Sequence, residues 1–117
     1  MRARILHTDD ILQIVDALRG QGYEVIAPFH GRGRDTFFDT VTDANRDAIG
    51  LHLANPYYAP KRYVLPHIEQ LLDIRREDST WSIEQTYYAP KRALFGVRSC
   101  DIAGIGHLDR FYLGREF

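Results

Sequence analysis

Arg98, Ser99, Cys100 and Asp101 are the consecutive residues of this chain whose types most favour local chemistry. They follow a short apolar run and precede a helical pattern, so we expect them where a strand ends and a helix begins. The start of a helix presents free N–H groups and a partial positive charge, which favours the thiolate form of a cysteine. Cys100 could therefore act as a thiolate, a metal ligand or a redox group.

A plainer alternative is a small buried cysteine that packs beside the helix start, with Asp101 as a helix N-terminal charge. The residue pattern alone favours this alternative. Cys100 is the only cysteine among the 117 residues, so an intrachain disulfide is excluded. It is also the only possible thiolate ligand, whereas a [4Fe–4S] cluster usually needs four. The five histidines are not paired at metal-ligand spacing, so a dedicated zinc site is not expected.

The hexapeptide YYAPKR occurs twice, at residues 57–62 and 87–92, each time ahead of an apolar segment. A functional interpretation is a paired basic and aromatic surface for an anionic cofactor or for a neighbouring protein of a complex. The alternative is that the repeat is a coincidence, and that each copy is an extended segment leading into an unrelated element. A single repeated hexapeptide favours this alternative. The candidate binding residues are the cations Lys61, Arg62, Lys91 and Arg92.

Other motifs are weak. Residues 31–34 (GRGR) could approach a phosphate, but they lack the spacing of phosphate-binding loops and favour a flexible turn. No serine lies in a GxSxG motif, and the carboxylates are scattered along the chain. Nothing in the sequence requires an enzyme.

Composition is that of an ordinary globular domain, with 44% hydrophobic residues, 26% charged residues and a net charge of −1. This balance gives no electrostatic reason to expect a nucleic-acid partner. No apolar run approaches the roughly 20 residues that span a bilayer, and the start lacks a signal-peptide pattern. We therefore expect one domain over residues 1–117, in the cytoplasm, without nucleic-acid binding or membrane insertion.

Apolar periodicity predicts the elements that position these residues. We expect a helix over residues 8–20, capped by Thr8 or Asp9 and ended by Gly20. A strand over 23–29 should be cut by Pro28 and followed by a turn over 30–35. Residues 36–41 and 48–53 favour two strands that form a hairpin across a polar turn.

The second half is less regular. We expect a short extended piece at 63–65, a helical turn opened by Pro66 that carries Ile68, Leu71 and Leu72, and a charged loop over 75–80. Residues 81–88 predict a strand, residues 93–97 a buried strand, and residues from Ser99 a helix with Ser99 and Asp101 as capping residues. Its apolar side would carry Ile102, Ile105, Leu108 and Tyr112. Together these elements predict an α/β or α+β domain, in which a mixed sheet is covered by at least two helices.

The segment ALFGVRSCDIAGIGHLDRFYL resembles part of an iron–sulfur family that includes the β subunits of cytoplasmic sulfhydrogenases and an electron-transfer component of anaerobic sulfite reductase. In those proteins a strand ending in Phe-Gly-Val leads to a Cys-Asp pair and an apolar helix. The matching positions here are Phe95, Gly96, Val97, Cys100, Asp101, Leu108, Asp109, Tyr112 and Leu113. A second match uses Pro60, Lys61, Tyr63, Pro66, Glu69 and Leu71. Ser99 stands where the family often has proline, and only residues 95–113 are specific.

The resemblance implies an electron-transfer subunit whose ferredoxin-like part, with its [4Fe–4S] clusters, follows this domain. That part is absent from the sequence, so we expect the clusters in a missing C-terminal part or in a partner, and no cofactor within this chain. The domain would not be catalytic alone. It would belong to a multisubunit hydrogenase, or a sulfur- or sulfite-reductase type of oxidoreductase, and would dock to catalytic or flavin-bearing subunits. Candidate interface or redox residues are then Arg98, Cys100, Asp101 and Asp109.

Two hypotheses of other classes stay open. One is a freestanding module that binds a small anionic ligand through the two YYAPKR segments, using Lys61, Arg62, Lys91 and Arg92. The other is a redox-active thiol enzyme centred on Cys100.

Overall fold

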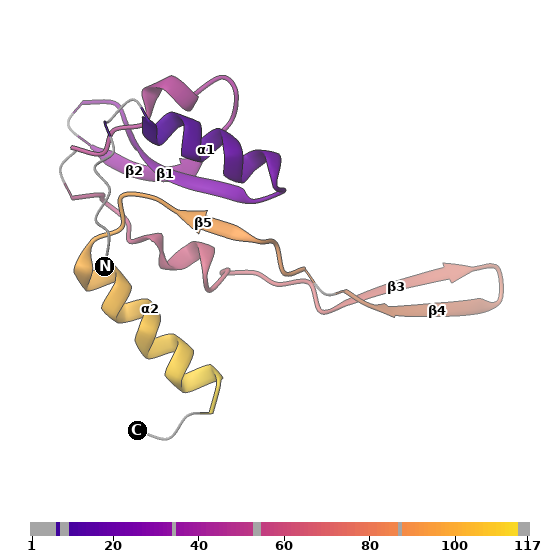
Figure 1. Ribbon diagram of the computed structural model, residues 1–117. Helices are drawn as coiled ribbons and strands as arrows, with labels where there is room; N and C mark the ends of the chain where they lie inside the picture. The colour runs from indigo at the N-terminus through magenta and orange to yellow at the C-terminus, as the bar shows by residue number, and fades with distance from the viewer. Residues whose placement is uncertain (1–6, 8–9, 34, 53–54, 87, 115–117) are drawn as a thin grey trace.

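The structure is a computed structural model that describes residues 7, 10–33, 35–52, 55–86 and 88–114. In chain order its elements are α1 (Asp10–Gly20), β1 (Glu24–His30), β2 (Thr36–Thr40), the 3₁₀ turns η1 (Arg46–Ala48) and η2 (Pro60–Tyr63), β3 (Leu72–Glu77), β4 (Thr80–Gln85), β5 (Arg92–Leu94) and α2 (Ser99–Tyr112). Figure 1 shows their arrangement.

A mixed sheet of order β2-β1-β5 forms the centre of the molecule. β1 runs antiparallel to β2, which follows it after a turn, and parallel to β5, which arrives much later in the chain. The remaining strands β3 and β4 pair only with each other. The predicted fold class is confirmed as α+β, with two helices, this mixed sheet and a small two-stranded sheet in the described ranges.

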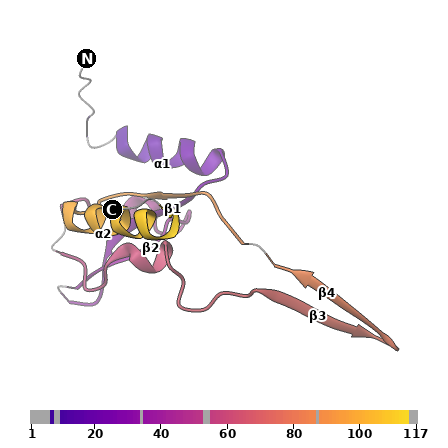
Figure 2. The same cartoon turned by 90° about the horizontal axis from the view of Figure 1, so that it is seen from below.

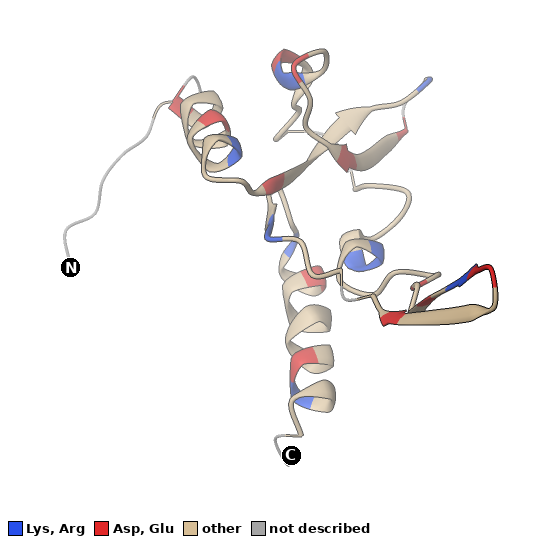
Figure 3. Ribbon diagram, turned by 90° about the vertical axis from the view of Figure 1, so that its right-hand side faces the viewer, with Lys and Arg blue, Asp and Glu red and all other residues tan. Residues whose placement is uncertain are grey.

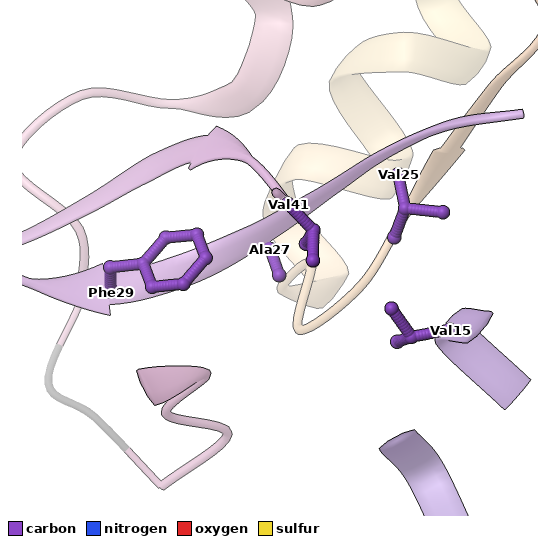
Figure 4. Close-up of a cluster of buried hydrophobic side chains, with 5 residues drawn as sticks. All are labelled: Val15, Val25, Ala27, Phe29 and Val41. Atoms are coloured by element: carbon purple, nitrogen blue, oxygen red, sulfur yellow. The ribbon is translucent and has the colours of Figure 1, made fainter. Parts of the chain in front are cut away.

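The hydrophobic core lies between α1 and one face of β1. Alternate residues of β1 place Val25, Ala27 and Phe29 on that face, where they meet Val15 of α1 and Val41 (Figure 4). The helix predicted over residues 8–20 is confirmed from Asp10 as α1, and its side chains Ile11 and Leu18 pack against the same cluster. Pro28 does not cut the strand. The pairing of β5 with β1 ends at Ile26, so the backbone N–H that proline lacks is not needed for that pairing.

The segment around η2 protects the outer edge of β2. The backbone N–H of Tyr57 donates to the carbonyl of Thr36 at 2.8 Å. The Tyr63 hydroxyl and the Arg62 guanidinium both donate to the carbonyl of Phe38, at 2.9 and 2.8 Å. These bonds satisfy carbonyl groups that an open strand edge would present to other chains.

An exposed ion pair ties α1 to the η1 turn. Arg46 donates to both carboxylate oxygens of Asp16, with 2.7 Å between Nε and Oδ1. This hydrogen bond lowers the pKa of Asp16 below its usual value, and the same bond raises the pKa of Arg46.

The predicted strand over 48–53 is wrong for its described residues. Arg46–Ala48 is a 3₁₀ turn, and residues 49–52 form no strand. Asn45 stabilises the turn, because its side chain accepts the Thr42 N–H at 2.7 Å and donates to the Thr40 carbonyl at 3.0 Å. β2 therefore pairs with β1, and the predicted turn after His30 connects the two strands.

Three predictions for residues 63–80 are also wrong. Residues 63–65 are not extended, since the N–H groups of Val64 and Leu65 both bond the Lys61 carbonyl and continue the η2 turn. Pro66 opens no helix, and Leu72 begins β3 instead. Residues 75–80 are the end of the β3–β4 hairpin, whose turn places Asp78 at a φ of 54°. The charged side chains of this segment suggested a loop, although Arg75, Arg76 and Glu77 lie on β3.

The other boundaries shift slightly. The strand expected over 81–88 is Thr80–Gln85, and the one over 93–97 is a shorter, partly buried Arg92–Leu94. The helix after residue 98 is confirmed as α2. The proposed caps Thr8 and Asp9 lie outside the described residues.

α2 projects from the central sheet in Figure 1, and the β3–β4 hairpin projects from it in Figures 1 and 2. No residue of α2 is buried, and its main contact is with η2. The radius of gyration is 18.4 Å, against about 13 Å for a compact chain of this length. The molecule therefore presents apolar elements that its own core does not cover.

Candidate functional site

The strand-to-helix junction predicted around Cys100 is confirmed. Gly96 has a φ of 68° and turns the chain after β5, so that α2 begins at Ser99. The Asp101 carboxylate accepts the backbone N–H of Arg98 at 3.4 Å, which confirms Asp101 as a capping residue. Cys100 is exposed, so the buried-cysteine alternative is wrong.

A cavity of about 200 Å³ joins this junction to the first YYAPKR segment. It is lined by Ala59, Lys61, Cys100, Asp101, Gly104, Ile105 and Leu108. Lys61 thus shares a cavity with Cys100 and Asp101, although about forty residues separate them in sequence. Asp109, by contrast, lies exposed further along α2 and does not line it.

Arg62 has a structural role in the first hexapeptide. Its guanidinium donates to the Phe38 carbonyl and, at 2.7 Å, to the Tyr63 hydroxyl, and it lies 4.8 Å from the Tyr63 ring centroid. Such a stacked arginine is held by its planar shape as well as its charge. Lys61, beside it, stays exposed.

Arg92 has the matching role in the second hexapeptide. Its Nε donates to Glu24 Oε2 at 2.6 Å, and its Nη1 donates to the Tyr63 carbonyl at 2.5 Å. Glu24 also accepts a hydrogen bond from the Thr40 hydroxyl at 3.2 Å. This network joins β1, β2, β5 and η2. Within it, the positive charge of Arg92 is paired with the Glu24 carboxylate. Lys91 is exposed.

The two hexapeptides lie close together in the fold. A cavity of about 570 Å³ is lined by Tyr58, Ala59, Lys61, Arg62, Leu65, Pro66 and His67. A second, of about 740 Å³, shares Leu65 and Pro66 with it and extends to Tyr88, Pro90 and Arg92. The sequence alone did not single out Glu24, because it is an isolated polar residue whose partner Arg92 comes from a distant segment.

Substitution of Arg62 by methionine is expected to lower the free energy of unfolding by about 1 kcal/mol, since it removes hydrogen bonds from a cation to the edge of β2. The Lys61→Met variant should unfold like the wild type, within about 0.5 kcal/mol, because Lys61 is exposed. Urea unfolding followed by circular dichroism measures both. Equal stability of the two variants would contradict the structural role of Arg62.

Among the residues that the structure describes, no three His, Cys, Asp or Glu side chains gather closely enough to hold a metal ion. Neither α1 nor α2, the two helices of the described ranges, has the length and apolarity to cross a membrane. No protein family, curated protein or solved structure was found to match the chain.

Proposed function

We propose that this chain is a cluster-free scaffolding domain of an iron–sulfur electron-transfer oxidoreductase, and that α2 docks it to a cluster-bearing domain or subunit. The observation that carries the proposal is that α2, within the segment of specific resemblance, buries none of its residues. Its apolar side chains Ile102, Phe111, Tyr112 and the adjacent Leu113 are 60–71% exposed. A helix whose apolar side chains stay exposed in the folded chain indicates a partner surface.

The chemistry of the junction suits the edge of such an interface. Cys100 is one exposed thiol beside Lys61 and Asp101, which is too few ligands for a cluster of its own. In this proposal the partner carries the [4Fe–4S] cluster, and the chain contributes a rigid sheet, the projecting helix and a charged rim. Arg98, Asp101 and Asp109 belong to that rim.

The proposed location is the cytoplasm, with catalytic or flavin-bearing subunits of a hydrogenase or of a sulfur- or sulfite-reducing enzyme as further partners. The sequence resemblance supports these partners, and the uncovered α2 supports a docking surface. The chain alone would be colourless.

Anoxic affinity purification of the full chain from its native cells tests the proposal. We expect the chain to retain a protein that contains iron and acid-labile sulfide in cluster stoichiometry. The double substitution Ile102→Asp and Phe111→Asp should remove that protein, because it places two charges among the exposed apolar side chains of α2. Gln13→Asp, on the exposed side of α1, is the matched control and should retain it. Stoichiometric iron on the isolated chain would contradict the proposal.

A further inference from the structure

The cavity of about 570 Å³ beside η2, named the η2 cavity below, combines cations with an aromatic and apolar lining. Lys61, Arg62 and His67 supply its basic side chains, and no carboxylate lines it. Tyr58 and Leu65 belong to its aromatic and apolar lining. Figure 3 shows basic residues on the short helical turn η2, which carries no acidic residue. The volume lies within the range of small-molecule sites, about 300–1,000 Å³. The η2 cavity therefore suits a small ligand that is anionic and partly apolar.

The guanidinium of Arg62 is held in place and keeps donors for a ligand. Its hydrogen bonds to the Phe38 carbonyl and the Tyr63 hydroxyl both start from Nη2. Its Nε and Nη1 donate to no group within the described residues. These remaining N–H groups are of the kind that binds phosphate and carboxylate oxygens. Because the Tyr63 ring and the two bonds already fix the side chain, less conformational freedom is lost on binding.

Lys61 adds a second cation to the same cavity. It is exposed and forms no ion pair within the described ranges, although it also lines the smaller cavity that contains Asp101. Lysine and arginine side chains are positive at neutral pH, and a phosphate monoester carries about −1.5 to −2 charges there. The two cations therefore match a phosphate group, whereas a carboxylate would balance only one of them.

Tyr58 gives the η2 cavity an aromatic surface. Its side chain is 65% exposed, and its ring meets the Tyr57 ring edge to face, with 4.8 Å between the ring centroids. Such an exposed ring is a stacking surface for a planar base. Leu65 and Pro66 extend the apolar lining. A ligand in which a planar ring system carries a phosphate group would use both kinds of lining.

The second hexapeptide builds no equivalent site. Its arginine is paired with Glu24 inside the protein, and Lys91 lines neither of the two cavities beside η2. Tyr88 lines the adjoining cavity of about 740 Å³, where Glu69 supplies a carboxylate that opposes an anion. Tyr88 and Lys91 hold the same positions in the repeat as the tyrosine and lysine of the η2 cavity. They are therefore matched controls for those two residues.

We infer that the η2 cavity binds a nucleoside monophosphate, with its base against Tyr58 and its phosphate on Lys61 and Arg62. His67 supplies one further donor from the same cavity. The net charge of −1 and the single pair of cations favour a mononucleotide over a nucleic-acid strand, which needs a row of cations along its backbone. The site uses no side chain of α2, so this inference stands apart from the docking proposal.

Nuclear magnetic resonance titration of the isotopically labelled full chain tests the site. The separate probes are adenosine 5′-monophosphate, inorganic phosphate and adenosine. We expect the monophosphate to shift the amide signals around η2 saturably. Its dissociation constant should be at least about tenfold lower than that of inorganic phosphate or of adenosine, because each of these lacks one of the two recognised parts.

Matched variants assign the two parts of the site. Lys61→Met and Tyr58→Ala should each weaken binding of the monophosphate about tenfold, whereas Lys91→Met and Tyr88→Ala should bind like the wild type. Tyr58→Ala should also leave the affinity for inorganic phosphate unchanged, which a loss of folding would not do.

Four results overturn the inference. They are signals around η2 that do not respond to the monophosphate, a monophosphate bound no more tightly than inorganic phosphate, equal losses in the variants and their controls, and saturation only by a single-stranded oligonucleotide or an acidic peptide.

Discussion

Replacement of Ile26 by alanine is expected to lower the free energy of unfolding by about 2–5 kcal/mol. Ile26 is fully buried and is the largest such side chain in the described residues. It lies in β1, opposite Thr40 of β2 and Leu94 of β5, so truncation leaves a cavity at the centre of the sheet.

Ile68→Ala is the matched control, since Ile68 is 90% exposed and the same atoms are removed. It should change the stability by no more than about 0.5 kcal/mol. Urea denaturation followed by circular dichroism compares the two variants. Similar losses for both would show that β1 is not the centre of the fold.

Substitution of Gly96 by alanine is expected to be nearly as damaging. Gly96 has a φ of 68°, a left-handed conformation that costs a residue with a side chain about 1–2 kcal/mol. A Cβ there would lie 2.8 Å from Cγ of Pro28, whose ring cannot rotate away, and such overpacking adds about 1–3 kcal/mol. Because Gly96 sets the turn from β5 into α2, the substitution should also weaken docking through α2.

Gly106→Ala gives the opposite expectation. Gly106 lies within α2, and a Cβ added there meets no atom within 4 Å. Alanine should therefore stabilise the helix by about 0.5–1 kcal/mol. Thermal unfolding of the two variants separates the effects, and a Gly96→Ala protein as stable as Gly106→Ala would contradict the geometry of the turn.

Apolar periodicity predicted the elements that build the core. Val15 and Leu18 repeat at helical spacing, and the apolar run of β1 ends near its turn, so both segments were found from the sequence. The β3–β4 hairpin was missed because its turn uses Asp78 at positive φ rather than a glycine or asparagine signal. The charged residues next to this turn also suggest a loop.

The candidate site was predictable only within single segments. The Cys100 and Asp101 junction follows from the order of residues along the chain, since a helix pattern begins directly after an apolar run. The cavity that brings Lys61 beside Cys100 depends on α2 packing against η2. The hydrogen bond from Arg92 to Glu24 depends on the parallel pairing of β5 with β1. Both are tertiary contacts that sequence spacing does not encode.

The proposed docking of this chain through α2 to a protein that carries a [4Fe–4S] cluster can be tested by electron paramagnetic resonance. The sample is the reduced complex, isolated without oxygen and recorded at low temperature. We expect a cluster signal with the wild type and with Gln13→Asp, and none with the Ile102→Asp, Phe111→Asp variant. No cluster signal in any sample, or an equal signal in all three, would contradict docking through α2.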